Sequence, residues 1–287
     1  MEDYNTLVLS GGALKGFSLL GCLQCLADDG LSKGIKKFIG TSVGAIISYL
    51  LCIGYTPIEI MVELCKNDWL EKMANFDIIN AVNNSGAISF SVITEVLERL
   101  TIDKIDHFIT LGELYTEFGK ELICCTYNFT QQKQEFVGPH DHPDLPCLVA
   151  LRMTSNLPIL FEPYLYDENY YLDGAVICNF PLFKVHLEKD VAIGIKFKKP
   201  MSKNITHLVQ FIYDLIIIPS ISLEEIMNKR HLEVVDVIEM DVQELHSFNF
   251  NLSKNDRLDM FSLGYETGKN FIKKKRSALS PLTQGPE

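Results

Sequence analysis

The N-terminal part of the sequence repeats one pattern twice: a short apolar run, a turn containing glycine, and an apolar stretch with helical periodicity. The first copy runs from "NTLVLS" into a helix expected over 16–30, and the second from "IKKFIG" into a helix expected over 43–55. Such strand–turn–helix repetition predicts a parallel β-sheet in an α/β fold. Parallel strands place the turns that follow them at one edge of the sheet, so the two turns are expected to share a cleft.

The rest of the chain continues the mixture of helices and strands. Helical periodicity predicts further helices over 89–100, 110–119, 146–155, 204–217 and 256–275. Apolar runs predict strands over 120–129, 169–172, 191–197 and 234–242. We therefore expect a three-layer α/β fold, a mostly parallel central sheet with helices on both faces. One domain over 1–276 and a loose C-terminal tail over 277–287 complete this prediction.

Charge and composition exclude several classes of protein. The net charge of −11 disfavours binding to nucleic acid, which repels an acidic surface. The acidic N-terminus lacks the basic and apolar regions of a secretory signal, and no apolar run reaches the ~18 residues of a membrane span. The eight cysteines do not have the spacing of a zinc site or a disulfide framework. These features predict a cytoplasmic protein.

The segment "GTSVG" places Ser42 between Gly40 and Gly44, after an expected strand and before an expected helix. It has three interpretations: an ordinary tight turn, a phosphate-binding loop or a nucleophile elbow. A phosphate loop ends in Gly-Lys-[Ser/Thr], whereas here Lys15 precedes Gly16. The strand–turn–helix context favours the elbow, in which a sharp turn exposes the hydroxyl and small residues let strand and helix approach. The N-terminus of the following helix also stabilises negative charge.

Two further segments bear on the serine. In "LSGGALKG", Gly11 and Gly12 leave backbone N–H groups that can point at an oxyanion, although the segment could also be a plain strand–helix turn. In "YYLDGAVICNFPLF", Asp173 follows a short apolar strand and precedes Gly174. That position allows a carboxylate to reach the same cleft, although Asp-Gly is more often a surface turn.

Taken together and in this order, the three segments resemble the patatin-like phospholipase family, which has a glycine-rich loop, G-x-S-x-G and Asp-Gly-[Ala/Gly]. "TSNLPILFEP" is similar to the family's segment ahead of the aspartate, and "NLSKNDRLDMFSLGYETG" is similar, more loosely, to its closing helix. The resemblance covers residues 7–268. It implies a lipid acyl hydrolase of phospholipase A or lysophospholipase type, acting on lipid substrates with peripheral membrane contact and no cofactor or metal.

The resemblance also assigns roles to residues. Ser42 matches the nucleophile and Asp173 the base of a Ser–Asp dyad. The matched positions of the oxyanion loop are Gly11, Gly12 and Ala13, with Lys15 as its basic position, and the other matched motif positions are Gly16, Gly40, Gly44, Gly174 and Ala175. Ala13 departs from the family, which usually has a third glycine there. If this residue needs a positive φ, alanine costs about 1 kcal/mol.

A conventional triad would add a histidine, and His186 and His246 come late enough in the chain. No motif supports either one, so we expect Asp173 to take the Ser42 proton directly, with its pKa raised by burial. A loop with metal-ligand residues, His140, Asp141, His142 and Asp144, is interrupted by proline and is expected to be solvated. Two alternatives remain open: a catalytically weak lipid-binding protein on the same fold, and an acyltransferase.

Overall fold

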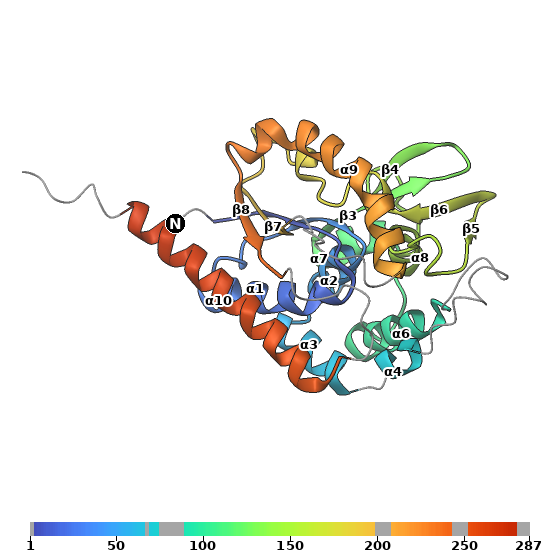
Figure 1. Ribbon diagram of the computed structural model, residues 1–287, viewed down its shortest axis with the longest axis horizontal. Coiled ribbons are helices and arrows are strands. Elements are labelled where there is room, and N and C mark those ends of the chain that lie inside the picture. Colours follow the sequence, from blue (N-terminus) through green and yellow to red (C-terminus); the bar gives the residue numbers. More distant parts are fainter. Residues whose placement is uncertain (1–2, 67–68, 75–88, 199–207, 243–251, 280–287) are drawn as a thin grey trace, which may run out of the picture.

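Figure 1 shows the computed structural model of the chain, which describes residues 3–66, 69–74, 89–198, 208–242 and 252–279. The strands are β1 (Thr6–Leu9), β2 (Lys37–Thr41), β3 (Glu121–Asn128), β4 (Lys133–Val137), β5 (Tyr164–Tyr166), β6 (Asn169–Asp173), β7 (Ala192–Phe197) and β8 (Asp236–Met240). The α-helices are α1 (Gly16–Asp28), α2 (Val43–Cys52), α3 (Pro57–Lys66), α4 (Trp69–Ala74), α6 (Ser91–Ile105), α7 (Leu111–Phe118), α8 (Cys147–Thr154), α9 (Leu208–Leu232) and α10 (Lys254–Leu279). Short 3-10 helices are η1 (Ala13–Lys15), η2 (Gly174–Val176) and η3 (Leu182–Lys184).

The described strands form one mixed sheet in the order β5-β6-β3-β2-β1-β7-β8, with β4 also paired to β3. β3, β2, β1, β7 and β8 run parallel to their neighbours in this order, whereas β4, β5 and β6 form antiparallel pairs. The mostly parallel α/β sheet that the sequence predicts is confirmed. The sequence analysis did not predict β4, which is mostly polar and only partly buried, or β5, which is very short.

Alternating side chains give each face of the sheet its own core. Leu7 and Leu9 of β1 join the larger core with residues of α1, α2 and α8. Val8 points to the opposite face and packs with Phe180 and Leu182, which lie between β6 and β7. α9 covers this second face, while α1, α2 and α10 lie across the sheet from it (Figure 1). The expected three-layer arrangement is therefore confirmed.

The two C-terminal helices are longer than the sequence predicts. α9 continues through Pro219 to Leu232, although the helical pattern predicted an end at 217. Residues 204–207 of that expected helix lie outside the described residues. α10 reaches Leu279 and so includes 277–279 of the expected tail, and 280–287 lie outside the described residues. A proline usually marks a helix end, and here the strong helix formers that follow Pro219 keep the helix going.

Two glycines allow α1 and α10 to pack backbone against backbone. A Cβ at Gly21 of α1 would collide with the carbonyl oxygen of Phe261, and one at Gly264 of α10 would collide with the carbonyl oxygen of Ser18. α1 begins directly after the glycine-rich loop. The close approach of α10 therefore supports the helix that leads out of that loop.

The length and apolarity of the helices bear on membrane crossing. In the part of the chain that the structure describes, no helix by itself is long and apolar enough to span a membrane. α2 and α3 together have the length and apolar composition of a membrane span, but the chain bends by 115° between them.

Candidate active site

Ser42 connects β2 to α2, since β2 ends at Thr41 and α2 begins at Val43. Its backbone has φ 55° and ψ −127°, and a residue with a side chain seldom adopts such a positive φ. The Ser42 N–H donates to Thr154 Oγ1 at 3.1 Å, and the Thr154 hydroxyl donates to the carbonyl oxygen of Cys125. The strained turn persists because the end of α8 and the sheet hold it in this conformation.

The glycines of "GTSVG" let three elements meet around the serine. A Cβ at Gly40 would lie 2.6 Å from the backbone nitrogen of Ala45, and one at Gly44 would lie 2.6 Å from the carbonyl oxygen of Leu9. Both separations are well inside van der Waals contact, so any side chain would push α2 away from the sheet. The structure thus gives both glycines the packing role that the G-x-S-x-G spacing predicts.

Asp173 is the last residue of β6 and is fully buried. The register of β3 explains why it lies beside Ser42. Cys125 of β3 pairs with Thr41, and the next residue, Thr126, pairs with Asp173. The ends of β2 and β6 therefore meet at neighbouring positions of β3. The Asp-Gly pair is consequently not a surface turn, the alternative that the sequence left open.

Burial is the main influence on the Asp173 carboxyl, and it raises the pKa to about 7. Asp173 Oδ1 accepts a hydrogen bond from the Ala175 N–H at 2.8 Å, and this bond and the nearby Ser42 hydroxyl both lower the pKa. Gly174, between Asp173 and Ala175, packs so closely against Cys125 of β3 that a side chain would not fit. Oδ2 has no hydrogen-bond partner within the described part of the chain. It is therefore the oxygen available to take a proton from Ser42.

Neither histidine of a conventional triad is found near this pair in the described structure. His186 is exposed on the surface, whereas Ser42 is buried. His246 lies outside the described residues. Where the chain is described, no group of His, Cys, Asp and Glu side chains could hold a metal ion. Metal-free chemistry stays a prediction.

The glycine-rich loop follows β1 and lies against the serine, since a Cβ at Gly11 would be 3.1 Å from Ser42 Cβ. The Gly11 N–H, however, donates to the carbonyl oxygen of Asn179 at 3.2 Å. This amide is not available to an oxyanion, which corrects the expectation that Gly11 is one of the donors. Within the described residues, the N–H groups of Gly12 and Ala13 make no hydrogen bond.

Ala13, the residue that departs from the family pattern, has the positive φ at which alanine is strained. Ala13 has φ 48°, in the left-handed region that favours glycine. Lys15 ends η1, with its ammonium 5.9 Å from the centre of the Phe197 ring. Gly16 then begins α1, where a Cβ would lie 2.6 Å from Val43 Cγ2. The loop is thus packed between the end of β7 and the start of α2, and Ala13 is strained within it.

An apolar pocket with about 930 Å³ of empty space, part of it open to solvent, reaches Ser42. Its walls come from α1, α2, α3, α4 and α6, together with part of the segment 155–161. Four of the lining residues come from α2: Val43, Ile46, Ile47 and Leu50. Ser42 and Ser155 supply the only hydroxyl groups among the described lining residues. The pocket therefore suits a hydrocarbon chain whose polar end lies at Ser42.

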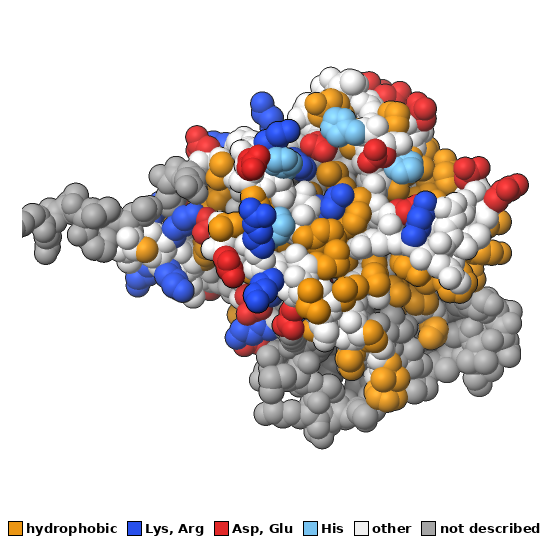
Figure 2. All heavy atoms as spheres, turned by 90° about the horizontal axis from the view of Figure 1, so that it is seen from above, with side chains coloured by type: hydrophobic (Ala, Val, Ile, Leu, Met, Phe, Trp, Pro, Cys, Tyr) orange, Lys and Arg blue, Asp and Glu red, His pale blue; other side chains and the backbone are white. Residues whose placement is uncertain are grey.

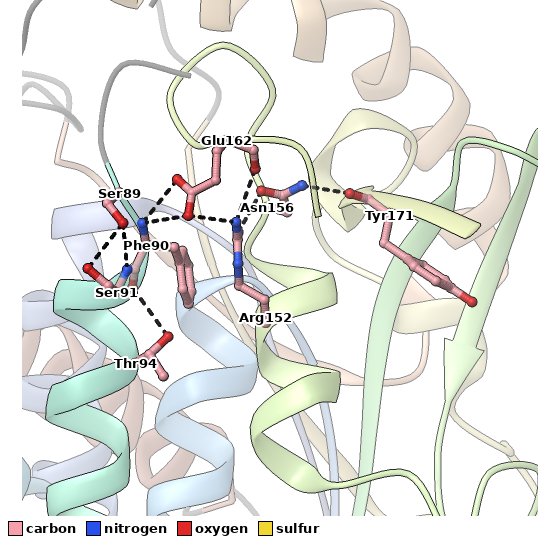
Figure 3. Close-up of polar contacts among 8 residues, drawn as sticks. All are labelled: Ser89, Phe90, Ser91, Thr94, Arg152, Asn156, Glu162 and Tyr171. Atoms are coloured by element: carbon pink, nitrogen blue, oxygen red, sulfur yellow. Dashed lines mark hydrogen bonds and ion pairs between the residues drawn. The ribbon is translucent and has the colours of Figure 1, made fainter. Parts of the chain in front are cut away.

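A buried arginine fixes the wall of this pocket (Figure 3). The guanidinium carbon of Arg152 lies 4.2 Å from the centre of the Phe90 ring, which lines the pocket. The guanidinium donates to Asn156 Oδ1 at 2.6 Å and to the carbonyl oxygen of Glu162 at 3.0 Å. The Glu162 carboxylate in turn accepts the Phe90 N–H at 3.2 Å. Burial lowers the pKa of Arg152 to about 10, so it remains a cation at neutral pH.

The same network reaches the strand that bears Asp173. Asn156 Nδ2 donates to the carbonyl oxygen of Tyr171 at 2.7 Å, and the Asn156 carbonyl oxygen accepts the Asp173 N–H at 2.9 Å. Figure 3 shows Asn156 between Arg152 and Tyr171. Sequence reasoning missed Arg152 and Asn156. The available signal was a single arginine within the otherwise uncharged helix "CLVALRMT".

Comparisons with known sequences identify relatives of this chain. A model of the patatin-like phospholipase family matches residues 7–185. The chain is 38% identical over 208 residues to the "Probable lipid hydrolase 463L" of Invertebrate iridescent virus 6, covering 70% of this chain and 67% of that protein. It is 27% identical over 285 residues to "Uncharacterized protein R571" of Acanthamoeba polyphaga mimivirus, covering 94% of each.

Solved structures show the same α/β fold. VipD from Legionella pneumophila has a TM-score of 0.59 at 16% identity, covering 95% of this chain and 67% of VipD. The type III effector protein ExoU has a TM-score of 0.56 at 14% identity. The match covers 96% of this chain and 53% of ExoU, so the chain spans about half the length of that protein. The matched family region includes both Ser42 and Asp173. The chain belongs to the patatin-like phospholipase family.

Proposed function

We propose that the chain is a lipid acyl hydrolase of phospholipase A or lysophospholipase type, with Ser42 as nucleophile and Asp173 as general base. The observation that supports this most directly is a strained serine beside a buried carboxyl of raised pKa, at an apolar pocket. A base next to a serine hydroxyl favours attack on an ester carbonyl, and the pocket favours a fatty-acyl group.

In the proposed reaction, Asp173 Oδ2 takes the proton of Ser42 Oγ as Oγ attacks the ester carbonyl carbon. The new C–O bond gives a tetrahedral intermediate with a negative oxygen. When this intermediate collapses, the lipid alcohol leaves with the proton from Asp173, and an acyl group remains on Ser42. The same carboxylate then takes a proton from water, whose oxygen attacks the acyl carbon. The bond from this carbon to Ser42 Oγ breaks, Oγ recovers the proton from Asp173, and the fatty acid leaves.

We assign the negative oxygen to the N–H groups of Gly12 and Ala13. Val43 offers a third donor, because the first N–H groups of α2 lack partners within the helix. The residue after the nucleophile commonly supplies such a donor, although sequence reasoning did not name it here. Each aligned N–H contributes about 3–4 kcal/mol of transition-state stabilisation.

The pocket supports a medium or long acyl chain. From Ser42 to Leu50, α2 advances ~12 Å at about 1.5 Å per residue. An extended chain covers ~3.5 Å in three bonds, so about ten carbons fit along this wall. Release of fatty acid from glycerolipids with a range of chain lengths tests the proposal, with longer chains expected to be preferred over acetyl groups. Binding without release would instead support a catalytically weak lipid-binding protein, the second candidate, which the strained Ala13 favours.

We also propose that the chain contacts a lipid surface near the pocket entrance. Leu157, Leu160 and Phe161 line the pocket, while Ile159 between them is 47% exposed and has φ 72°. An apolar side chain projecting from the pocket rim can enter the edge of a lipid aggregate. This contact and the cytoplasmic location remain predictions.

The pH dependence should follow the Asp173 carboxyl. The base acts only when ionised, and its pKa is raised to about 7. We therefore expect kcat/KM to fall about tenfold per pH unit below the pKa and to level off above it. Initial rates on an ester without ionisable groups, from about pH 5 to 9, measure this profile. Full activity at the acidic end would contradict a base with a raised pKa.

Replacing Ala13 with glycine should increase turnover. Glycine adopts a positive φ freely, so relief of about 1 kcal/mol at the oxyanion loop would raise kcat up to about fivefold. KM should change little, because the gain occurs in the transition state. Ala27→Gly, in the regular backbone of α1, is the matched control and should give no gain. A robust wild-type rate that Ala13→Gly leaves unchanged would reject the idea of a strained oxyanion loop.

A further inference from the structure

The helix α9 buries polar side chains and exposes apolar ones. Among its described side chains, Ser220 and Asn228 are the buried ones, at 3% and 2% exposed. Glu224 lies midway between them, so the three share one helix face. Leu215 and Ile226, on the opposite face, are 54% and 73% exposed. Figure 2, seen from above, shows hydrophobic side chains gathered across this surface. The polar face is therefore the one that holds α9 to the molecule.

This polar face binds the irregular segment that follows Asp173. Ser220 Oγ donates to the carbonyl oxygen of Ala175 at 3.1 Å. The Glu224 carboxylate accepts the N–H groups of Asn179 and Phe180 at 2.9 and 2.8 Å. A segment without strand pairing needs partners for its backbone polar groups, and α9 supplies them. A charged acceptor makes these bonds stronger than neutral ones.

Asn179 in turn binds both backbone groups of Gly11. The Asn179 carbonyl oxygen accepts the Gly11 N–H at 3.2 Å, and Asn179 Nδ2 donates to the Gly11 carbonyl oxygen at 3.2 Å. The contact is tight, because a Cβ at Gly11 would lie 2.5 Å from Asn179 Oδ1. Gly11 directly precedes Gly12 and Ala13, whose N–H groups we assign to the oxyanion. A continuous chain of hydrogen bonds therefore links α9 to the oxyanion loop.

We propose that Asn179 is a positioning residue for the oxyanion loop and that Glu224 holds Asn179 in place. The inference rests on the proposed function, since it takes Gly12 and Ala13 as oxyanion donors. Fixing Gly11 through both its N–H and its carbonyl oxygen sets the direction of the next two amides. The oxyanion forms only during the reaction, so loss of this alignment should lower kcat and leave KM nearly unchanged.

Steady-state kinetics on a soluble short-chain ester test the positioning role. Asn179→Ala removes the Nδ2 bond to the Gly11 carbonyl oxygen and keeps the backbone bond to the Gly11 N–H. It should lower kcat by about 10- to 100-fold, the range expected for misplaced donors, with KM within about twofold of wild type. Glu224→Ala should also lower kcat. Glu224→Gln keeps an oxygen acceptor for the two N–H groups and should restore most of kcat. An unchanged kcat in Asn179→Ala, or an effect on KM alone, would overturn the proposal.

Asn228→Ala is the matched control. Asn228 lies on the same face of α9, but its side chain binds the backbone of Phe180 and Phe183 rather than Asn179. The variant should have a lower melting temperature and, well below it, a kcat close to wild type. An equal loss of kcat in Asn228→Ala and Asn179→Ala would mean that general loosening, not loop positioning, causes the effect.

Hydrogen exchange provides a readout that needs no activity. The peptide 9–17 should exchange its amide hydrogens faster in Asn179→Ala than in wild type or Asn228→Ala. If the wild-type chain releases no fatty acid, the proposed function fails, and the exchange experiment still decides whether Asn179 positions the loop. Equal exchange of this peptide in all three proteins would overturn the inference.

Discussion

Replacing Ser42 with alanine is expected to lower the rate of ester hydrolysis by at least about 10⁴-fold, because the acyl-enzyme can no longer form. The fold should persist, since the bond from the Ser42 backbone N–H to Thr154 does not involve the lost hydroxyl. Release of fatty acid from a glycerolipid measures the loss. A fluorophosphonate probe, which reacts with activated serines, should label the wild type and not the variant.

Ser48→Ala is the matched control for this experiment. Ser48 is a buried serine of α2, the helix that follows Ser42, and its hydroxyl has no hydrogen-bond partner within the described structure. This variant should fold, react with the probe and hydrolyse the ester like the wild type. Equal labelling of wild type and Ser42→Ala would place the nucleophile elsewhere in the chain.

Asp173→Asn is expected to lower activity by about 10²–10⁴-fold, the usual contribution of a general base. Asparagine keeps the size of the side chain and an oxygen that accepts the Ala175 N–H, yet it cannot take a proton from Ser42. Fatty-acid release again measures the loss. Asp167→Asn, in the exposed turn before β6, is the control and should remain active. Retention of full activity in Asp173→Asn would exclude the Ser–Asp dyad.

The same substitution should not destabilise the fold at alkaline pH. The Asp173 pKa is about 7 in the folded chain and near 3.9 in an unfolded one. Between these values the folded chain holds a proton that the unfolded chain has lost, so the carboxyl lowers the free energy of unfolding as pH rises to about 7. Asp173→Asn removes this cost. Its melting temperature near pH 8 should equal or exceed that of the wild type, and a large decrease would show that the carboxylate stabilises the fold.

The meeting of Ser42 and Asp173 could be predicted only in part. The repeated strand–turn–helix pattern correctly indicates that the serine turn and the glycine-rich turn lie at one edge of a parallel sheet. Asp173 reaches the site by a different route, at the end of the antiparallel strand β6. That geometry depends on β3, where Thr126 lies just past the residue paired with Thr41. Sequence periodicity cannot show such register, so the resemblance to the family identified Asp173.

The contacts that hold the loop could not be predicted. Gly11 looked like a free donor in the sequence, but its N–H belongs to Asn179, far away along the chain. Hydrogen bonds to a backbone group far away in the sequence, whether from backbone or from a side chain, leave no periodic signal in either segment. The one available trace was the spacing of Ser220, Glu224 and Asn228, which makes a polar helix face, but all three lie beyond 217, where the sequence predicted the helix to end. Such a face is ordinarily assigned to solvent.

The packing of α10 on α1 places part of the support for the site outside the region that the family model matches. The family match ends at 185, before α9 and α10 begin. A fragment cut there would contain both Ser42 and Asp173, yet the glycine-lined surface of α1 around Gly21 would lose its cover. Transferring the matched region alone into another protein would therefore move the reactive groups without their supports. The boundary of the family model at 185 is therefore a poor guide for truncating or recombining this chain.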